Sequence, residues 1–193
     1  DDHLKNGQLK PAYNAQISTE NQIITHYSIH QTPGDITTLE KHLNSFEELN
    51  GVQSKEVVAD AGYGSEQNYE IMEEKEIDAY VKYSFYYKEQ KASQKENPFV
   101  VQNLYYNEQD DYYVCPMGQH MEFKEERSKV STTGYKSRTR YYEASRCEGC
   151  PMRGMCYKGN ENRTIEINQN LNRHRSKARE LLGSEKGLYH RRK

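Results

Sequence analysis

Residues 56–66 read EVVADAGYGSE, and this stretch decides how the first part of the chain folds. A short apolar run ends at Asp60, a loop with two glycines follows, and Ser65 is a suitable N-cap for a helix that continues to about Glu76. A short apolar run between two helical segments is typical of a buried parallel strand. Asp60 is therefore expected at the carboxyl end of a central strand, where α/β proteins place their chemistry. The alternative is that Asp60 only caps the next turn.

The segments on either side complete an α/β pattern. Residues 13–18 and 23–30 read as strands and predict an antiparallel hairpin. Apolar residues recur at helical spacing over residues 36–49, and residues 77–81 predict one more strand. The order of strands and helices predicts an α/β fold, in which a mixed sheet is flanked by helices.

Helical periodicity disappears after residue 81, and tyrosine, glycine and polar residues dominate up to residue 167. Four short strands are expected in this region, at residues 104–106, 112–114, 135–142 and 164–167. Helical character returns over residues 168–182, and a further helix is expected from Glu185.

The chain thus divides into three parts. Residues 1–81 are expected to form part of an α/β core, and residues 82–167 a β-rich insertion that contains the cysteines. Residues 168–193 are expected to be a basic helical return to the core.

The formal net charge of −2 hides an asymmetry between the two ends of the chain. Residues 1–119 hold 9 Lys and Arg against 20 Asp and Glu, a balance of −11, whereas residues 120–193 hold 18 against 9, a balance of +9. A basic half favours a polyanion as partner, although a solvated surface has the same composition. We find no apolar run of the roughly 18 residues that a membrane span needs, and no signal-peptide pattern. We therefore expect a cytoplasmic protein without a membrane partner.

Basic residues are concentrated near the C-terminus. Arg173 and Lys177 are spaced four apart on the expected helix, as are Arg175 and Arg179, so each pair shares a helix face. Such faces bind phosphates with salt-dependent affinity, unless they are simply solvated. The predicted DNA-binding residues are Arg173, Arg175, Lys177, Arg179, Arg191 and Arg192, and Arg163 and Lys186 belong to the same basic region.

All four cysteines lie in the second half of the chain, at Cys115, Cys147, Cys150 and Cys156. Without a secretory leader, clustered cysteines favour metal binding over disulfides. Four thiolates that include a Cys-x-x-Cys pair can hold Zn²⁺, and their softness favours Zn²⁺ or an iron–sulfur cluster over hard cations. We expect a structural zinc site, with His120 as a substitute for one thiolate. Four reduced thiols are the alternative.

Three parts of the sequence form a recognisable set, namely KNGQLKPAYNAQ at residues 5–16, VVADAGYGSE at residues 57–66, and CPMG at 115–118 together with CEGCP at 147–151. Together they resemble bacterial insertion-sequence transposases of the DDE type. The resemblance extends over nearly the whole chain, and the run around Asp60 is its most specific part. The chain is similar to the C-terminal half of such a protein, an RNase H-like DDE domain with a cysteine-containing insertion.

The resemblance implies three carboxylates that bind two Mg²⁺ or Mn²⁺ ions and catalyse DNA cleavage and strand transfer. Asp60 matches the second acid and would be the catalytic metal ligand. The first acid would lie on a strand before Asp1. The third, a Glu, would follow Lys193, because residues 189–192 are similar to a Tyr-x-x-Arg signature that precedes it. The implied partners are the transposon ends and the target DNA, bound by paired subunits at the bacterial nucleoid.

Two other functions agree with the same residues. A remnant that binds DNA without cutting it would carry Asp60 without the other two acids. A zinc-binding interaction module would use the cysteines, with the α/β part as a scaffold. Asp35 is interpreted as a helix cap rather than a metal ligand, and His26 and His30 as structural residues.

Overall fold

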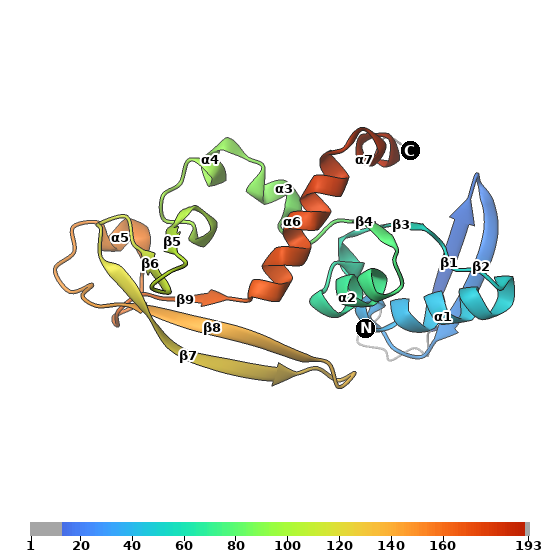
Figure 1. Cartoon of the computed structure of the whole chain (residues 1–193), viewed down its shortest axis with the longest axis horizontal. Coiled ribbons are helices and arrows are strands. Elements are labelled where there is room, and N and C mark those ends of the chain that lie inside the picture. The colour runs from blue at the N-terminus through green and yellow to red at the C-terminus, as the bar shows by residue number, and fades with distance from the viewer. Residues whose placement is uncertain (1–12, 192–193) are drawn as a thin grey trace, which may run out of the picture. The chain divides into compact units, whose positions relative to one another are not determined.

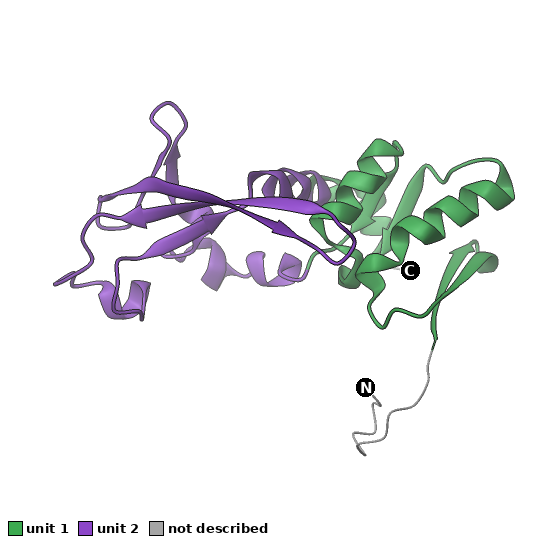
Figure 2. Cartoon of the chain, turned by 90° about the horizontal axis from the view of Figure 1, so that it is seen from below, with its two compact units in different colours: residues 1–83, 180–193 green, residues 84–179 purple. Residues whose placement is uncertain are grey.

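The structure, a computed structural model, describes residues 13–191, and the chain forms two compact units (Figure 2). Unit 1 comprises residues 1–83 and 180–193, and unit 2 comprises residues 84–179. The predicted boundaries after residues 81 and 167 stay predictions. None of the helices between residues 13 and 191 combines the length and the apolar composition that crossing a membrane requires.

The strands and helices of unit 1 follow the sequence-based expectation (Figure 1). The predicted hairpin, the helix after it, the strand before Asp60 and the last strand are all present. The elements are β1 (Asn14–Glu20), β2 (Ile23–His30), η1 (Asp35–Thr37), α1 (Leu39–Asn50), β3 (Glu56–Ala59), η2 (Ala61–Tyr63), α2 (Glu66–Glu74), β4 (Asp78–Val81) and α7 (Glu185–His190).

Unit 1 contains two small sheets instead of the single mixed sheet that the sequence predicted. β1 and β2 pair antiparallel, β3 and β4 pair parallel, and no strand among residues 13–191 joins the two pairs. Polarity patterns identify strands, but hydrogen bonding between strands depends on which segments meet in space. The α/β class is therefore confirmed, while the RNase H-like arrangement stays a proposal.

The core of unit 1 is built by α1, α2 and β4. Leu39 and Leu43 of α1, Tyr69 and Met72 of α2, and Val81 of β4 are buried. The hydroxyl of Tyr69 donates to the backbone oxygen of Val81 at 2.9 Å, which satisfies a polar group inside this core.

The β1–β2 hairpin turns its polar face, and not its apolar face, toward α1. The hydroxyls of Ser18 and Ser28 each lie 2.6 Å from a ring nitrogen of His42. On the opposite face, Ile17 and Tyr27 are cross-strand neighbours and are 59% and 66% exposed. Since soluble proteins rarely expose a continuous apolar surface, residues 13–191 leave this face without the cover that it needs.

Unit 2 is built around a five-stranded antiparallel sheet with the strand order β5-β6-β7-β8-β9. Its elements are α3 (Tyr86–Glu89), α4 (Ala92–Lys95), η3 (Val101–Asn103), β5 (Tyr105–Asn107), β6 (Tyr112–Val114), β7 (His120–Val130), β8 (Lys136–Ala144), α5 (Arg153–Cys156) and β9 (Thr164–Ile167). The helix α6 (Gln169–Gly183) starts in unit 2 and ends in unit 1. The core of unit 2 consists of Leu104, Tyr113, Met121, Tyr142, Ala144, Ile165 and Ile167.

The sequence predicted four of these strands but not β7. Most positions of β7 are charged or polar and exposed, so its sequence, HMEFKEERSKV, lacks the alternating apolar pattern of a half-buried strand. Only Met121 of β7 is fully buried, and backbone pairing with β6 and β8 fixes the rest.

Candidate functional site

Asp60 lies where the sequence placed it, directly after β3. Its backbone is extended, and its Oδ1 accepts the backbone N–H of Gly62 at 2.7 Å, which caps the short helix η2. The capping role that the sequence offered as an alternative is therefore real. It uses one carboxylate oxygen only. Because Asp60 is exposed and its Oδ2 has no hydrogen bond within residues 13–191, this oxygen is available to a cation.

Two glycines shape the loop beside Asp60. A Cβ on Gly64 would lie 2.2 Å from the backbone oxygen of Lys82, so only glycine allows the loop to approach the end of β4 this closely. A Cβ on Gly62 would lie 2.9 Å from Oδ1 of Asp60 and 3.7 Å from Oδ2 of Asp35. The carboxylates of Asp60 and Asp35 therefore lie next to each other on one side of Gly62.

Asp35 is the functional candidate that the sequence interpretation missed. It was interpreted as a helix cap, but Gly34 is the N-cap of η1, and α1 is preceded by Thr38. The Oδ1 of Asp35 instead accepts from Nδ2 of Asn14 at 2.8 Å and from Nε2 of Gln16 at 3.1 Å. The cap interpretation was wrong because the partners of Asp35 come from a strand about twenty residues earlier in the chain.

A tyrosine completes this polar cluster. The hydroxyl of Tyr63 donates to Oε1 of Gln16, which is buried. Burial raises the pKa of Tyr63, and the negative charges of Asp35 and Asp60 raise it further. The run Tyr13-Asn14-Ala15-Gln16 was part of the resemblance without an assigned chemistry. Because residues two apart on a strand share a face, Asn14 and Gln16 point to the same side and hold Asp35 together.

The carboxylates of Asp35 and Asp60 both lie beside Gly62, so a single cation could bind both. Hard oxygen ligands suit Mg²⁺ and Mn²⁺, and Mg²⁺ commonly takes only one or two carboxylates from a protein and keeps several waters. Within residues 13–191 no group of three or more His, Cys, Asp or Glu is placed to hold a metal ion. Asp35 and Asp60 thus form an open, two-acid arrangement.

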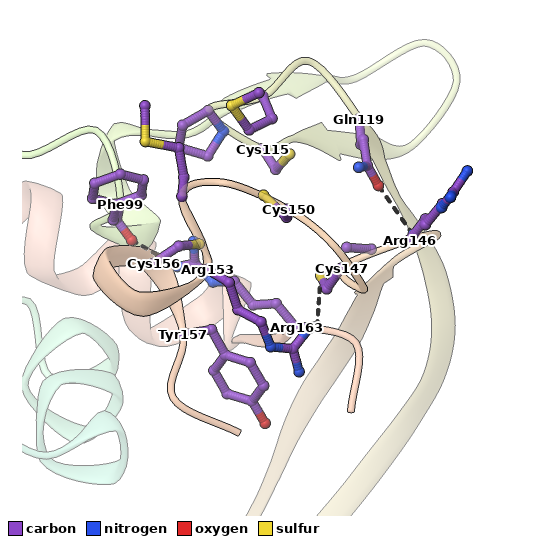
Figure 3. Close-up of a pocket in the computed structure, with 14 residues that line it drawn as sticks. Phe99, Cys115, Gln119, Arg146, Cys147, Cys150, Arg153, Cys156, Tyr157 and Arg163 are labelled. Atoms are coloured by element: carbon purple, nitrogen blue, oxygen red, sulfur yellow. Dashed lines mark hydrogen bonds between the residues drawn. The ribbon is translucent and has the colours of Figure 1, made fainter. Parts of the chain in front are cut away.

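The four cysteines converge on one pocket of unit 2 (Figure 3). They come from the β6–β7 turn, the segment after β8, and α5, and all four are half-buried and unpaired by disulfides. Two turns with left-handed glycines present them: Gly118 donates to the oxygen of Cys115 at 2.8 Å, and Gly149 lies between Cys147 and Cys150. As they lie, the thiols are not grouped closely enough to form a closed metal site.

Arg163 borders the same pocket and is only 7% exposed. Its backbone N–H donates to Sγ of Cys147 at 3.3 Å, and its Nη1 donates to Sγ of Cys156 at 3.0 Å. Its Nη2 donates to the oxygen of Phe99 at 2.6 Å, and no carboxylate within residues 13–191 pairs with it. Arg163 is therefore a buried cation beside sulfur atoms, and not a solvent-facing part of the basic region.

The remaining basic residues have varied surroundings. On α6, Arg173 and Lys177 are exposed, Arg175 is half-buried, and Arg179 pairs with Glu89 at 3.3 Å. On α7, Lys186 pairs with Glu56 of β3, and His190 lies 4.9 Å from Tyr80 between ring centroids. Arg191 is half-buried, and Arg192 lies outside the described residues, as do residues 5–12 of the resemblance. DNA binding by these residues stays a prediction.

Comparison with known proteins gives one match. A family model described as transposase DDE domain matches residues 114–193, which include all four cysteines, α6 and α7 but not Asp60. This match confirms the resemblance to DDE-type transposases, while the bacterial and insertion-sequence details stay predictions. No curated protein and no solved structure matches the chain.

Proposed function

We propose that this chain, whose residues 114–193 match the family model of the transposase DDE domain, is part of an enzyme that cuts DNA and transfers strands with divalent metal ions. The observation that carries the proposal is the two-acid cluster at the end of β3. There Asp60 is exposed, keeps a free carboxylate oxygen and is followed by a loop that requires glycine at residue 64, and Asp35 lies beside it.

The residues of the cluster fit a hard divalent cation. Asp60 would bind Mg²⁺ or Mn²⁺ through Oδ2 while Oδ1 keeps its bond to Gly62. Asp35, held by two side-chain amides, would add a second carboxylate or orient a metal-bound water. When bound, the metal ions of such sites activate the attacking oxygen and stabilise the leaving oxygen of a phosphodiester.

The exposed apolar face of the β1–β2 hairpin is evidence that further segments of chain complete the core of unit 1. Ile17, Tyr27 and Ile29 are 59%, 66% and 62% exposed on this face. We infer that further chain before Asp1 and after Lys193 covers it, and that it supplies the strand with the first catalytic acid and the helix with the third. The RNase H-like arrangement then follows from the completed sheet.

The test is Asp60→Asn in the full-length protein, assayed for metal-dependent cleavage and strand transfer on transposon-end DNA. Strand transfer is expected to fall at least about 1,000-fold, because a metal ligand loses its charge. Asp78→Asn, at the start of the neighbouring strand β4, removes an equal charge and is the control. Activity of Asp60→Asn near that of the control would refute the assignment, and an inactive parent protein that still binds DNA would establish the non-catalytic remnant instead.

DNA is the partner that the family implies. Arg173 and Lys177 are exposed on one stretch of α6 and are suited to phosphate contacts. A pair of subunits acting on two DNA ends, in a bacterial cytoplasm at the nucleoid, belongs to the same proposal.

The cysteine pocket supports a second function, a zinc-dependent module within the same chain. A buried cation needs an anionic partner, and among the described residues the guanidinium of Arg163 donates to the sulfur of Cys156 while its backbone N–H donates to the sulfur of Cys147. Thiolate ligands on Zn²⁺ would supply this negative charge. Binding would require the four thiols to come closer together than they lie in the structure.

Metal analysis of the purified chain tests this second function. One equivalent of Zn²⁺ is expected, with loss of the metal and of thermal stability in Cys147→Ser. Met155→Ser, at an exposed position in the adjoining helix α5, is the control for local disturbance. Protein that contains no metal and whose stability a chelator leaves unchanged would favour four reduced thiols.

A further inference from the structure

The hairpin formed by β7 and β8 extends beyond the rest of its sheet (Figure 1). β6 pairs with β7 only up to Glu122, and β9 pairs with β8 only from Arg140 onward. Residues 127–139 therefore form a two-stranded arm, in which each strand pairs with the other and with no third strand of the described chain. At about 3.3 Å per residue, the arm reaches roughly 20 Å from the sheet.

The far end of this arm is basic and rich in hydroxyl groups. Residues 128–139 read SKVSTTGYKSRT and contain three cations and no acid. Seven of the twelve side chains in this segment carry a hydroxyl. Lysine, arginine and hydroxyl side chains are the groups that proteins use to contact the phosphates and sugars of DNA.

The three cations are exposed and have no side-chain partner in the part of the chain that the structure describes. Lys129, Lys136 and Arg138 make no hydrogen bond or ion pair of their side chains with any described residue. The cations closer to the sheet differ. Arg127 pairs with Glu125 at 2.5 Å, and Arg140 pairs with Asp111 at 2.6 Å. The sheet thus neutralises the cations at its base and leaves a charge of +3 at the end of the arm.

The register of the arm places cations on both of its faces. Lys129 lies opposite Ser137 on one face, and Val130 lies opposite Lys136 on the other, the face that Arg138 shares. Val130 is the only large apolar side chain of residues 128–139 that is strongly exposed, at 62%. A partner with an apolar surface would find little to contact, whereas a groove with a row of phosphates on each side matches a ribbon charged on both faces.

We propose that residues 128–139 dock in the major groove of duplex DNA as a β-ribbon. The major groove, about 12 Å wide and 8.5 Å deep, admits a two-stranded ribbon, whereas the deep, narrow major groove of duplex RNA does not. Lys129, Lys136 and Arg138 contact phosphates, and the hydroxyls next to them donate to phosphate oxygens. The inference rests on the proposed function, because that function makes DNA the substrate, and it adds a contact surface far in sequence from α6.

The test measures binding of the chain to a short fluorescent DNA duplex over a salt series. The variant is Lys129→Gln with Lys136→Gln and Arg138→Gln, which keeps the side chains polar and removes the three charges. The control is Lys91→Gln with Lys95→Gln and Lys158→Gln, three exposed lysines of the same unit that lie off the arm. Thermal unfolding of both variants confirms that they fold. A third variant, Lys129→Arg with Lys136→Arg, changes the side chains of the arm but keeps their positive charges.

The arm variant is expected to bind at least about 10-fold more weakly at low salt. The slope of log affinity against log salt is expected to become less negative by about 2 to 3, since each phosphate contact contributes about −0.9. The control and the arginine variant keep the slope. If the parent chain binds DNA and the arm variant keeps its slope, the inference is wrong while the proposed function stands. Equal competition by duplex RNA also overturns groove docking. A parent chain that binds no DNA at any salt overturns both.

Discussion

Asp60 in unit 1 and Asp111 in unit 2 both lie in turns beside strands, and their partners differ in number. Asp111 accepts two hydrogen bonds from Arg140, at 3.2 and 2.6 Å, and one each from the hydroxyls of Tyr106 and Tyr142, both at 2.8 Å. Asp60 accepts one, from Gly62. A carboxylate whose two oxygens both accept hydrogen bonds from the protein stabilises the fold, whereas one with an unused oxygen can bind a ligand.

The pKa values around Asp111 agree with a structural role. Burial raises the pKa of Asp111, but the hydrogen bonds from Arg140, Tyr142 and Tyr106 outweigh burial and lower it below its ordinary value. Tyr142 is fully buried, and burial, followed by its bond to Asp111, raises the pKa of its hydroxyl. Asp111 therefore stays ionised at neutral pH and holds the tyrosines of the unit 2 core in place.

Asp111→Asn is the largest expected change in stability. The substitution leaves the guanidinium of Arg140 without its anion and places amide hydrogens against donors, which is expected to cost about 3 kcal/mol of the unfolding free energy of unit 2. Denaturant unfolding followed by tyrosine fluorescence measures it. The control is Asp110→Asn, whose side chain accepts only from Asn107 at 3.2 Å. Equal stability of the two variants would mean that the hydrogen bonds of Asp111 contribute nothing.

His42, like Asp111, has all of its side-chain polar atoms in hydrogen bonds, because its two ring nitrogens contact the hydroxyls of Ser18 and Ser28. Burial, followed by the charges of His26 and His30, lowers the pKa of His42 from 6.5 to about 4. His42 therefore takes up a proton near pH 6.5 in the unfolded chain but only at about pH 4 in the folded chain. The contribution of neutral His42 to the unfolding free energy is fully present above pH 6.5, and about 2 kcal/mol of it is expected to be lost as the pH drops toward 4.

Unfolding free energies between pH 7 and about 4 test this effect of His42. His42→Gln is expected to remove most of the loss, whereas the exposed His120→Gln keeps it. An unchanged pH dependence in His42→Gln would assign the loss to other groups.

Asp35 is intermediate between the two aspartates. Its Oδ1 is used by two amides, while its Oδ2 lies on the Gly62 side, next to Asp60. Asp35→Asn is expected to weaken Mn²⁺ binding about 10-fold, or about 1.4 kcal/mol, because one carboxylate charge is lost at the ion. Mn²⁺ broadening of the Gly62 amide NMR signal measures the affinity. Asp78→Asn is the matched control, and affinity equal to that control would limit Asp35 to packing.

Asp60→Asn has the smallest expected effect on stability, which separates its role from that of Asp111. The asparagine oxygen still accepts from the N–H of Gly62, so the unfolding free energy is expected to change by less than about 1 kcal/mol. Thermal unfolding next to the parent chain measures this change. A loss as large as that of Asp111→Asn would make Asp60 a structural residue.

Local sequence patterns predicted the parts of the molecule that depend on neighbours along the chain. The strand before Asp60 and the N-cap Ser65, which accepts from Asn68 at 3.2 Å, are present as expected. These features follow from short apolar runs and from side chains that bond within a few residues. Within residues 13–191, unit 1 forms two small sheets where a single mixed sheet was predicted, and β7 was not predicted, because strand pairing joins segments whose own polarity does not specify a partner.

The sequence by itself determined the α/β class, the position of Asp60 after its strand, the clustering of the cysteines and the resemblance to DDE transposases. Only the tertiary structure decided that Asp35 lies beside Asp60, that Arg163 is buried against two cysteines, and that residues 127–139 form an arm. Asp35 is fixed by Asn14, 21 residues away, and Arg163 by Phe99, 64 residues away. Contacts over such separations depend on how distant segments pack, and the spacing of residues along a chain carries no record of that packing.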